Sequence, residues 1–254
     1  MIQVIKSKDN TLVKYIKKLK SNSFAKEEGR FVIEGEHLCL MAKDSLEYVF
    51  TPVELDEKIY PKQYLVTNEI MEKLSDGKSP ARMIGVCLMK KAKNIDSRLT
   101  LYLDDVQDPG NVGTIFRTAL SFGFDTVYVT DKTAFEYNSK VIQASQGAIF
   151  DLNIIHVSKD KLSELKKGGN ILVSTALRDN SVFAHDFIFK KSEKYVIILG
   201  NEGKGISKDI LDMSDVSLKI NIKGMESLNV AIAGGIIMNQ AYNSKEWILW
   251  RKKV

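Results

Sequence analysis

The sequence predicts an α/β protein organised around parallel strands, and two observations carry this prediction. Four apolar residues at 196–199 run directly into a loop that holds Gly200, Gly203 and Gly205, which is typical of a buried parallel strand ending in a tight turn. Apolar and amphipathic segments also alternate along most of the chain, as in α/β folds. Because ligands in open α/β folds lie outside the carboxyl ends of strands, we expect a cofactor at this glycine loop.

The glycine loop fits neither of two common nucleotide-binding patterns. A dinucleotide fingerprint read from Gly203 would need its third glycine where Lys208 stands. A P-loop would need lysine after its last glycine, whereas Ile206 follows Gly205. Taken alone, the loop is equally consistent with a strand-to-helix turn that binds nothing. Glu202 is the one acidic residue within it.

Length and composition describe an ordinary globular protein. The 254 residues suffice for one large or two modest domains, and 44% are hydrophobic and 27% charged. The formal charge of +5 permits a polyanionic partner without requiring one. Cys39 and Cys87 have apolar neighbours and form no Cys-x-x-Cys pair, so free buried thiols in a reducing compartment are expected. Charge at Lys6 and the lack of a long apolar run argue against a signal peptide or membrane span, and we infer a cytoplasmic protein.

The first ninety residues predict a small α/β domain. Its first element is a helix over 10–19, whose apolar residues recur at helical spacing while lysines occupy the outer face. Asp9 or Asn10 could cap this helix. Its lysines could contact phosphates, although a solvated surface helix explains them equally. The later elements are strands at 30–35, 47–50, 64–66 and 83–89 and helices at 36–42 and 68–74.

A polar, charged stretch at 90–98 separates this domain from the next. We therefore predict a domain over 1–93, a linker over 94–98 and a second domain over 99–254. The second domain begins with a strand at 99–103.

A turn at Pro109 and Gly110 then leads into a helix for which Asn111 is a plausible N-cap. Arg117 falls off the apolar stripe of this helix and could face the same site as Asn111. An arginine there could grip a phosphate in a bidentate fork, or could simply be a surface residue.

The remaining elements continue the alternation. Strands are expected at 126–130, 152–157, 171–176 and 216–222, helices at 139–147, 159–167 and 207–213, and a polar connection at 177–192. Ser227 is a natural N-cap for a last helix over 228–243, which is apolar nearly all round. Such a helix must be buried, in the core or at a subunit interface. His37 has no second ligand at metal spacing, and His156 and His185 have no partners that suggest catalysis. No ligand cluster indicates a metal site.

Three stretches together are more specific than any one of them. Residues 111–117 read Asn-Val-Gly-Thr-Ile-Phe-Arg, residues 199–205 read Leu-Gly-Asn-Glu-Gly-Lys-Gly, and residues 226–231 read Glu-Ser-Leu-Asn-Val-Ala. In order and spacing, the chain resembles the SpoU (TrmH-like) RNA 2′-O-ribose methyltransferases of the SPOUT superfamily. Residues 7–10 and 28–36 also resemble the L30e-like substrate-binding domain of rRNA-modifying members. The resemblance therefore spans nearly the whole chain.

This resemblance implies a fold, a cofactor and an assembly. The implied fold is an L30e-like α/β domain followed by a SPOUT parallel-sheet domain whose C-terminal part forms a trefoil knot. S-adenosyl-L-methionine would bind against the knotted loops without a metal, and the active form would be a homodimer joined through the knot helices. The residues implied to contact the cofactor are Leu199, Gly200, Asn201, Glu202, Gly203, Ile220, Met225 and Leu228.

The implied reaction is methyl transfer to a ribose 2′-hydroxyl of structured RNA, with rRNA favoured over tRNA. By resemblance, Arg117 acts on the hydroxyl; because arginine stays protonated, we expect it to grip the adjacent phosphate and orient the hydroxyl. Asn111 would align the nucleotide, Glu202 would hold the loop or the ribose, and Ser227 and Asn229 would support the site. A non-catalytic RNA-binding protein and a Rossmann-type nucleotide enzyme are the alternatives. The intact motifs argue against the first, and the lack of a glycine fingerprint after the strand at 99–103 argues against the second.

Overall fold

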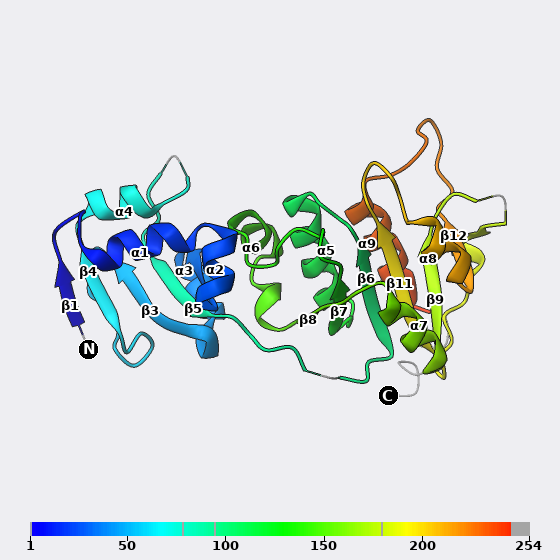
Figure 1. The fold of residues 1–254 in the computed structure, drawn as a ribbon, viewed down its shortest axis with the longest axis horizontal. Coiled ribbons are helices and arrows are strands. Elements are labelled where there is room, and N and C mark those ends of the chain that lie inside the picture. Colours follow the sequence, from blue (N-terminus) through cyan, green and yellow to red (C-terminus); the bar gives the residue numbers. More distant parts are fainter. Residues whose placement is uncertain (1, 78, 94, 179, 245–254) are drawn as a thin grey trace. The chain divides into compact units, whose positions relative to one another are not determined.

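The computed structural model describes residues 2–77, 79–93, 95–178 and 180–244, which form two compact units (Figure 1). The first unit holds the described residues up to Lys91 together with 137–150, and the second holds 92–136 and the described residues from Asp151 onward. Each unit is a mixed α/β structure with its own sheet, so the predicted fold class is confirmed. Residues 245–254, which end the predicted second domain, lie outside the described residues. Among the described residues, no helix is long and apolar enough to cross a membrane.

The first unit is built on a five-stranded mixed sheet in the order β1-β4-β3-β5-β2. Its strands are β1 (Ile2–Ile5), β2 (Arg30–Glu34), β3 (Leu46–Thr51), β4 (Gln63–Val66) and β5 (Ile84–Leu88). β4 pairs in parallel with β1 and β3, whereas β5 runs antiparallel to β2 and β3. β1 was not expected from the sequence: it is a short edge strand in which only Ile5 is buried, and so short a segment carries no readable period.

Helices pack against this sheet. They are α1 (Thr11–Leu19), α2 (Asn22–Glu28), α3 (Glu36–Met41), α4 (Asn68–Leu74) and α6 (Ser139–Ser145). In α1 the residues Val13, Ile16 and Leu19 are buried in the core, and the Oδ1 atom of Asn10 caps the helix by accepting from the Leu12 amide at 2.8 Å. The expected helix with a lysine-bearing outer face is confirmed; α2 was not expected.

The second unit is built on a seven-stranded sheet in which every pairing is parallel, in the order β10-β12-β9-β11-β6-β7-β8. Its strands are β6 (Leu99–Asp104), β7 (Thr126–Val129), β8 (Asn153–His156), β9 (Asn170–Thr175), β10 (Val182–Phe183), β11 (Lys194–Gly200) and β12 (Val216–Lys219). The apolar run at 196–199 is β11, which lies between β9 and β6 and is buried from Tyr195 to Gly200. The expected central strand is confirmed, while β10 lies inside the connection predicted to be without structure.

Helices α5 (Pro109–Ser121), α7 (Asp160–Lys167), α8 (Lys208–Met213) and α9 (Val230–Tyr242) complete this unit, and α9 packs against α5 and β11. The inner side of α9 is buried, at Ala231, Gly234, Ile237, Met238 and Ala241. Its outer side leaves Ile232 55% and Ile236 40% exposed. The core of the single chain therefore buries only one side of this helix, and burial of the other side at a subunit interface stays a prediction.

Two helix caps differ from the predicted ones. The N-cap of α5 is Asp108, whose Oδ1 accepts from the Asn111 amide at 2.8 Å, and Pro109 takes the first helical position, where its missing N–H costs nothing. The N-cap of α9 is Asn229, whose Oδ1 accepts from the amides of Ala231 and Ile232. The predicted caps, Asn111 and Ser227, are therefore wrong, and the Asn111 side chain is free for other contacts.

Candidate functional site

A cavity of about 610 Å³ lies in the second unit, around the carboxyl ends of its strands β9, β11 and β12. Apolar side chains and the glycine loop form most of its wall, together with three basic side chains and one acidic one. Its lining comprises Thr175, Ala176, Leu177, Arg178, Gly200, Asn201, Glu202, Gly203, Lys204, Gly205, Ile206, Leu211, Leu218, Lys219, Ile220, Ile222, Ser227, Leu228, Asn229, Val230, Ala233 and Ile237. The volume and the apolar side chains beside a few polar groups are typical of small-molecule sites, at the edge of the sheet where the sequence placed a ligand.

The glycine loop folds back tightly on itself. Asn201 and Gly205 exchange two backbone hydrogen bonds, at 3.1 and 2.9 Å. A Cβ atom at Gly200 would lie 2.4 Å from the Ile206 nitrogen and 2.5 Å from the Gly205 carbonyl carbon, so only glycine fits where the loop crosses it. The Asn201 Oδ1 atom accepts from the amides of Gly203 and Lys204, both at 3.0 Å. The loop is therefore held in one shape by its own contacts.

Three polar side chains from distant parts of the chain form a hydrogen-bonded series beside this loop. The Asn229 Nδ2 atom donates to Asn111 Oδ1 at 2.8 Å, and Asn111 Nδ2 donates to Glu202 Oε1 at 3.0 Å. The Glu202 carboxylate also accepts from the amides of Asp108 at 3.0 Å and Gln107 at 3.2 Å. The series thus joins the glycine loop to the first turns of α5 and α9.

The environment of Glu202 keeps it ionised. Partial burial raises the pKa of its carboxyl, but hydrogen bonds from the Asn111 side chain and from the backbone amides outweigh that effect and lower the pKa below its ordinary value. An ionised carboxylate only accepts hydrogen bonds. Glu202 therefore fixes the donors around it and is not suited to act as a proton donor at neutral pH.

The other predicted site residues differ in whether they line the cavity. Ser227, Ile220 and Leu228 line the cavity, as do the loop residues 200–203. Leu199 is fully buried and packs against α9. A Cβ atom added at Gly234 would lie only 2.7 Å from Leu199 Cδ1. Met225 is 76% exposed and outside the lining.

Arg117 is exposed on the surface of α5 and does not line the cavity. Within the part of the chain that the structure describes, its guanidinium has no partner. Asn111 and Arg117 are therefore not brought into contact with each other. The structure gathers Asn111, Glu202 and Asn229 into one hydrogen-bonded group and leaves the arginine open to solvent.

Several cavity residues were missed from the sequence. Thr175 ends β9 and residues 176–178 follow it, and Lys219 ends β12. Arg178 is fixed by donating to the Leu211 carbonyl at 3.1 Å and the Asp212 carboxylate at 3.2 Å. Ligands lie outside the carboxyl ends of strands in such sheets, and the same rule applied to β9 as well as β11 would have found residues 175–178. In the described residues no cluster of three or more metal-ligating side chains occurs.

Comparison with known proteins finds relatives that align over most of the chain. The family described as SpoU rRNA Methylase matches residues 98–239. A Bacillus subtilis protein named 23S rRNA (guanosine(2553)-2′-O)-methyltransferase RlmP is 32% identical over 92% of this chain and 97% of its own length. An Aquifex aeolicus structure described as a TrmH/SpoU tRNA modifying enzyme is 30% identical, with a TM-score of 0.53, over 59% of this chain and 77% of that one.

Solved structures share the fold over almost the full length. The rRNA methyltransferase from Sinorhizobium meliloti superposes with a TM-score of 0.87 at 24% identity, over 95% of this chain and 98% of that one. Its AdoMet-bound form gives the same TM-score at 23% identity. With the family match over more than half of the chain, and a relative aligned over nearly all of it, this chain belongs to the SpoU rRNA methylase family.

Proposed function

We propose that this protein is an S-adenosylmethionine-dependent methyltransferase that methylates a ribose 2′-hydroxyl in rRNA. The observation that carries the proposal is the series Asn229–Asn111–Glu202 beside the cavity at the strand ends. All three residues come from stretches that resemble the family's motifs. The Bacillus subtilis relative, which aligns over nearly all of both chains, is named for a guanosine of 23S rRNA, and we extend that substrate class to this protein.

The cavity suits the proposed cofactor. Its volume of about 610 Å³ and its apolar walls at Ile220, Leu228 and Ile237 fit a nucleoside. When bound, S-adenosylmethionine supplies a sulfonium methyl group; transfer breaks the C–S bond, forms a bond to the ribose 2′-oxygen and releases the hydroxyl proton. Leu199 and Met225, also proposed contacts, could act only through the backbone or after a movement of residues 223–226.

We assign the remaining roles in the reaction to Arg117, Asn111 and Ser227. Arg117, exposed and unpaired in the described part of the chain, is available to grip an RNA phosphate and hold the 2′-hydroxyl in line, with that phosphate helping to accept the proton. Asn111, fixed on both sides by Asn229 and Glu202, would align the nucleotide. Ser227, on the cavity wall, would support the same site. Alignment of carbon and oxygen supplies most of the rate gain in such a transfer.

The first unit is the proposed RNA-recognition domain. It holds most of the predicted segment 1–93 together with residues 137–150, and we propose residues 94–98 as the linker to the methyltransferase domain. Lys14, Lys17 and Lys18 lie at helical neighbour positions on the exposed face of α1. Lys14 lies 3.6 Å from Asp9, and no ion pair of the other two occurs among the described residues. Two unpaired cations on one helical turn suit a phosphate backbone.

The proposed assembly is a homodimer of knotted, cytoplasmic chains. Ile232 and Ile236 are exposed one turn apart on α9, which supports a subunit interface along this helix. In support of the knot that the resemblance implies, α9 follows β12 in sequence but packs against β11, two strands away, where Gly234 meets Leu199. Light scattering after size exclusion tests the dimer, and an Ile236→Glu variant that remains dimeric would exclude this helix from the interface.

A tRNA substrate is the second candidate, because the Aquifex aeolicus relative is described as a tRNA modifying enzyme. It aligns with 59% of this chain, whereas the relative named for 23S rRNA aligns with 92%. The wider alignment, which must include most of the first unit, favours rRNA.

Calorimetric titration tests the proposal first. S-adenosylmethionine and S-adenosylhomocysteine should bind, and NAD and ATP should not. Mapping of 2′-O-methyl groups in cells lacking the gene should then show one missing rRNA modification, restored by the wild-type gene. If no binding occurs with RNA absent or present, the protein is a non-catalytic RNA-binding protein; loss of a tRNA methyl group instead would establish the second candidate.

A further inference from the structure

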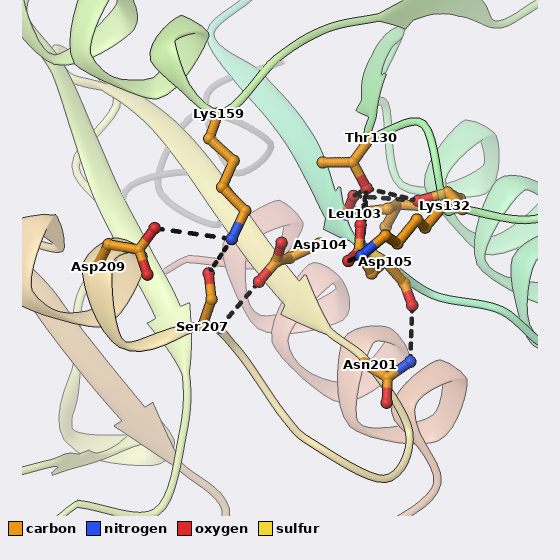
Figure 2. A network of polar contacts seen from close by, with 10 residues as sticks. Leu103, Asp104, Asp105, Thr130, Lys132, Lys159, Asn201, Ser207 and Asp209 are labelled. Carbon is orange, nitrogen blue, oxygen red and sulfur yellow. Dashed lines mark hydrogen bonds and ion pairs between the residues drawn. The ribbon is translucent and has the colours of Figure 1, made fainter.

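Two adjacent aspartates at the end of β6 hold the two ends of the glycine loop (Figure 2). The Asp105 carbonyl accepts from Asn201 Nδ2 at 2.8 Å, at the start of the loop. The Asp104 Oδ2 atom accepts from the Ser207 amide at 2.9 Å, just beyond its end. The cavity residues 202–206 therefore lie between two anchored positions, Asn201 and Ser207, whose partners lie at the end of the neighbouring strand.

The first anchor depends on an uncommon backbone conformation. Asp105 has a positive φ of 59°, which few residues other than glycine adopt. The conformation is held by Thr130, whose Oγ1 accepts from the Asp105 amide at 2.9 Å and donates to its carboxylate at 2.6 Å. Turned in this way, the Asp105 carbonyl reaches Asn201.

The second anchor places a carboxylate in the interior. Asp104 is 3% exposed, and its Oδ1 atom has no hydrogen-bond partner in the described structure. A buried carboxylate with so few partners is costly to keep. An apolar residue at this position would be more favourable for stability. The presence of Asp104 therefore indicates that its contact with Ser207 has a role other than stability.

The Ser207 side chain does not take part in this anchor. Its Oγ atom accepts instead from Lys159 Nζ at 2.9 Å, and the same lysine lies 3.6 Å from the Asp209 carboxylate (Figure 2). Only the backbone N–H of Ser207 meets Asp104. The two contacts of Ser207 can therefore be removed separately.

We propose that Asp104 is a positioning residue for the cofactor: through the Ser207 amide it sets the position of the Gly200–Ile206 loop, and with it the affinity for S-adenosylmethionine. The inference rests on the proposed function. Asp104 does not line the cavity, so its effect on binding must pass through the loop. Asn201, anchored by Asp105, has the matching role at the other end.

Substitutions at both ends of the Asp104–Ser207 contact test this proposal. Asp104→Ala removes the acceptor, whereas Asp104→Asn keeps an acceptor oxygen. Ser207→Pro removes the N–H together with the hydroxyl, at a φ of −62° that suits proline. Ser207→Ala removes only the hydroxyl bonded to Lys159, so the difference between the two variants isolates the N–H. Thr100→Val is the matched control, because it deletes another buried hydrogen bond of β6, the one at 3.3 Å to the Tyr195 carbonyl, near the opposite end of that strand.

The readout is the Kd for S-adenosylmethionine by calorimetry, with KM and kcat on RNA. We expect Asp104→Ala and Ser207→Pro each to raise Kd and KM about tenfold or more, with kcat at saturating cofactor changed less than about threefold. Asp104→Asn, Ser207→Ala and Thr100→Val should stay within about threefold of wild type. The double variant Asp104→Ala/Ser207→Pro should be no worse than Ser207→Pro alone, because Asp104→Ala removes a contact that the proline has already removed.

Binding by Asp104→Ala or by Ser207→Pro at wild-type affinity would overturn the proposal. If Asp104→Ala does not fold, the pair Ser207→Pro and Ser207→Ala decides alone, since both keep the buried carboxylate. A wild-type protein that binds no S-adenosylmethionine would instead refute the proposed function, so the two failures are distinguishable.

Discussion

The side-chain amide of Asn229 donates to Asn111 Oδ1 at 2.8 Å, across 118 residues of sequence. The direction of this bond is fixed, because Asn229 Oδ1 is already used to cap α9 and only its Nδ2 is free. Asn111 must therefore present its own Nδ2 to Glu202, at 3.0 Å. The orientation of each amide follows from a helix cap at one end and a carboxylate at the other.

The first prediction tests the donor–acceptor direction of the hydrogen bond between Asn111 and Glu202. Asn111→Asp replaces the donor to Glu202 with a second carboxylate, so methyl transfer should fall about 10- to 100-fold. Asn111→Asp combined with Glu202→Gln restores a donor–acceptor pair of opposite direction and should recover part of the rate. Initial rates on an rRNA transcript measure both. An Asn111→Asp enzyme at the wild-type rate would show that the series does not orient the site.

The second prediction concerns Arg117, which is exposed on α5 and outside the cavity lining. Arg117→Ala should bind S-adenosylmethionine with unchanged Kd and lose methylation by about 100-fold or more, because only the RNA contact is removed. Ser121→Ala, one turn along the same helix and also exposed, is the control and should keep full activity. Turnover by Arg117→Ala at the wild-type rate would rule out the assigned role.

What the sequence predicted well is what depends on long apolar patterns. β11 is a continuous apolar run and α5 carries a regular stripe, so both were placed within a few residues. The short edge strands β1 and β10 were missed, because four and two residues carry too little pattern. Their existence depends on pairing with β4 and β12, which no local signal encodes.

The sequence predicted the residues of the hydrogen-bonded series at the candidate site but not the hydrogen bonds that join them. Several polar residues near each helix start could serve as a cap, and the sequence favoured Asn111 and Ser227 over Asp108 and Asn229. At α5 a signal was available, since proline at the first helical position points to the residue before it as the cap. The Asn229–Asn111 contact itself follows only from the packing of α9 on α5.

The third prediction compares two adjacent glycines of α9. A Cβ atom at Gly234 would lie 2.7 Å from Leu199 Cδ1, whereas one at Gly235 would meet only Thr118 Cγ2 at an ordinary 3.6 Å. Gly234→Ala should therefore destabilise the fold by about 1–3 kcal/mol through overpacking. Gly235→Ala should be neutral or stabilise the chain by up to about 1 kcal/mol, because alanine favours a helix. Chemical denaturation measures both, and equal effects would contradict the packing at Leu199.

The fourth prediction concerns RNA binding by the first unit. Replacing Lys17 and Lys18 of α1 by glutamine should weaken RNA binding and reduce the slope of log Kd against log salt concentration by up to about 2, one for each phosphate that is no longer neutralised. Cofactor affinity should not change. Lys43 and Lys58, exposed elsewhere in the same unit, are replaced in a matched control of equal charge. If both double variants weaken binding equally, net charge rather than the α1 face drives binding.

The last prediction concerns the pH dependence of stability. Burial raises the pKa of the Cys39 thiol to about 12 and holds that of Cys87 well above its ordinary value. In the unfolded chain a thiol has a pKa of about 8.5. Above that pH the unfolded chain therefore binds fewer protons than the folded one, and the free energy of unfolding falls as pH rises. The decrease between about pH 8.5 and 9.5 should be partly abolished in the Cys39→Ala/Cys87→Ala variant, in which no thiol remains to ionise on unfolding. Urea unfolding at each pH measures it, and identical slopes for the two proteins would show that the thiols do not contribute.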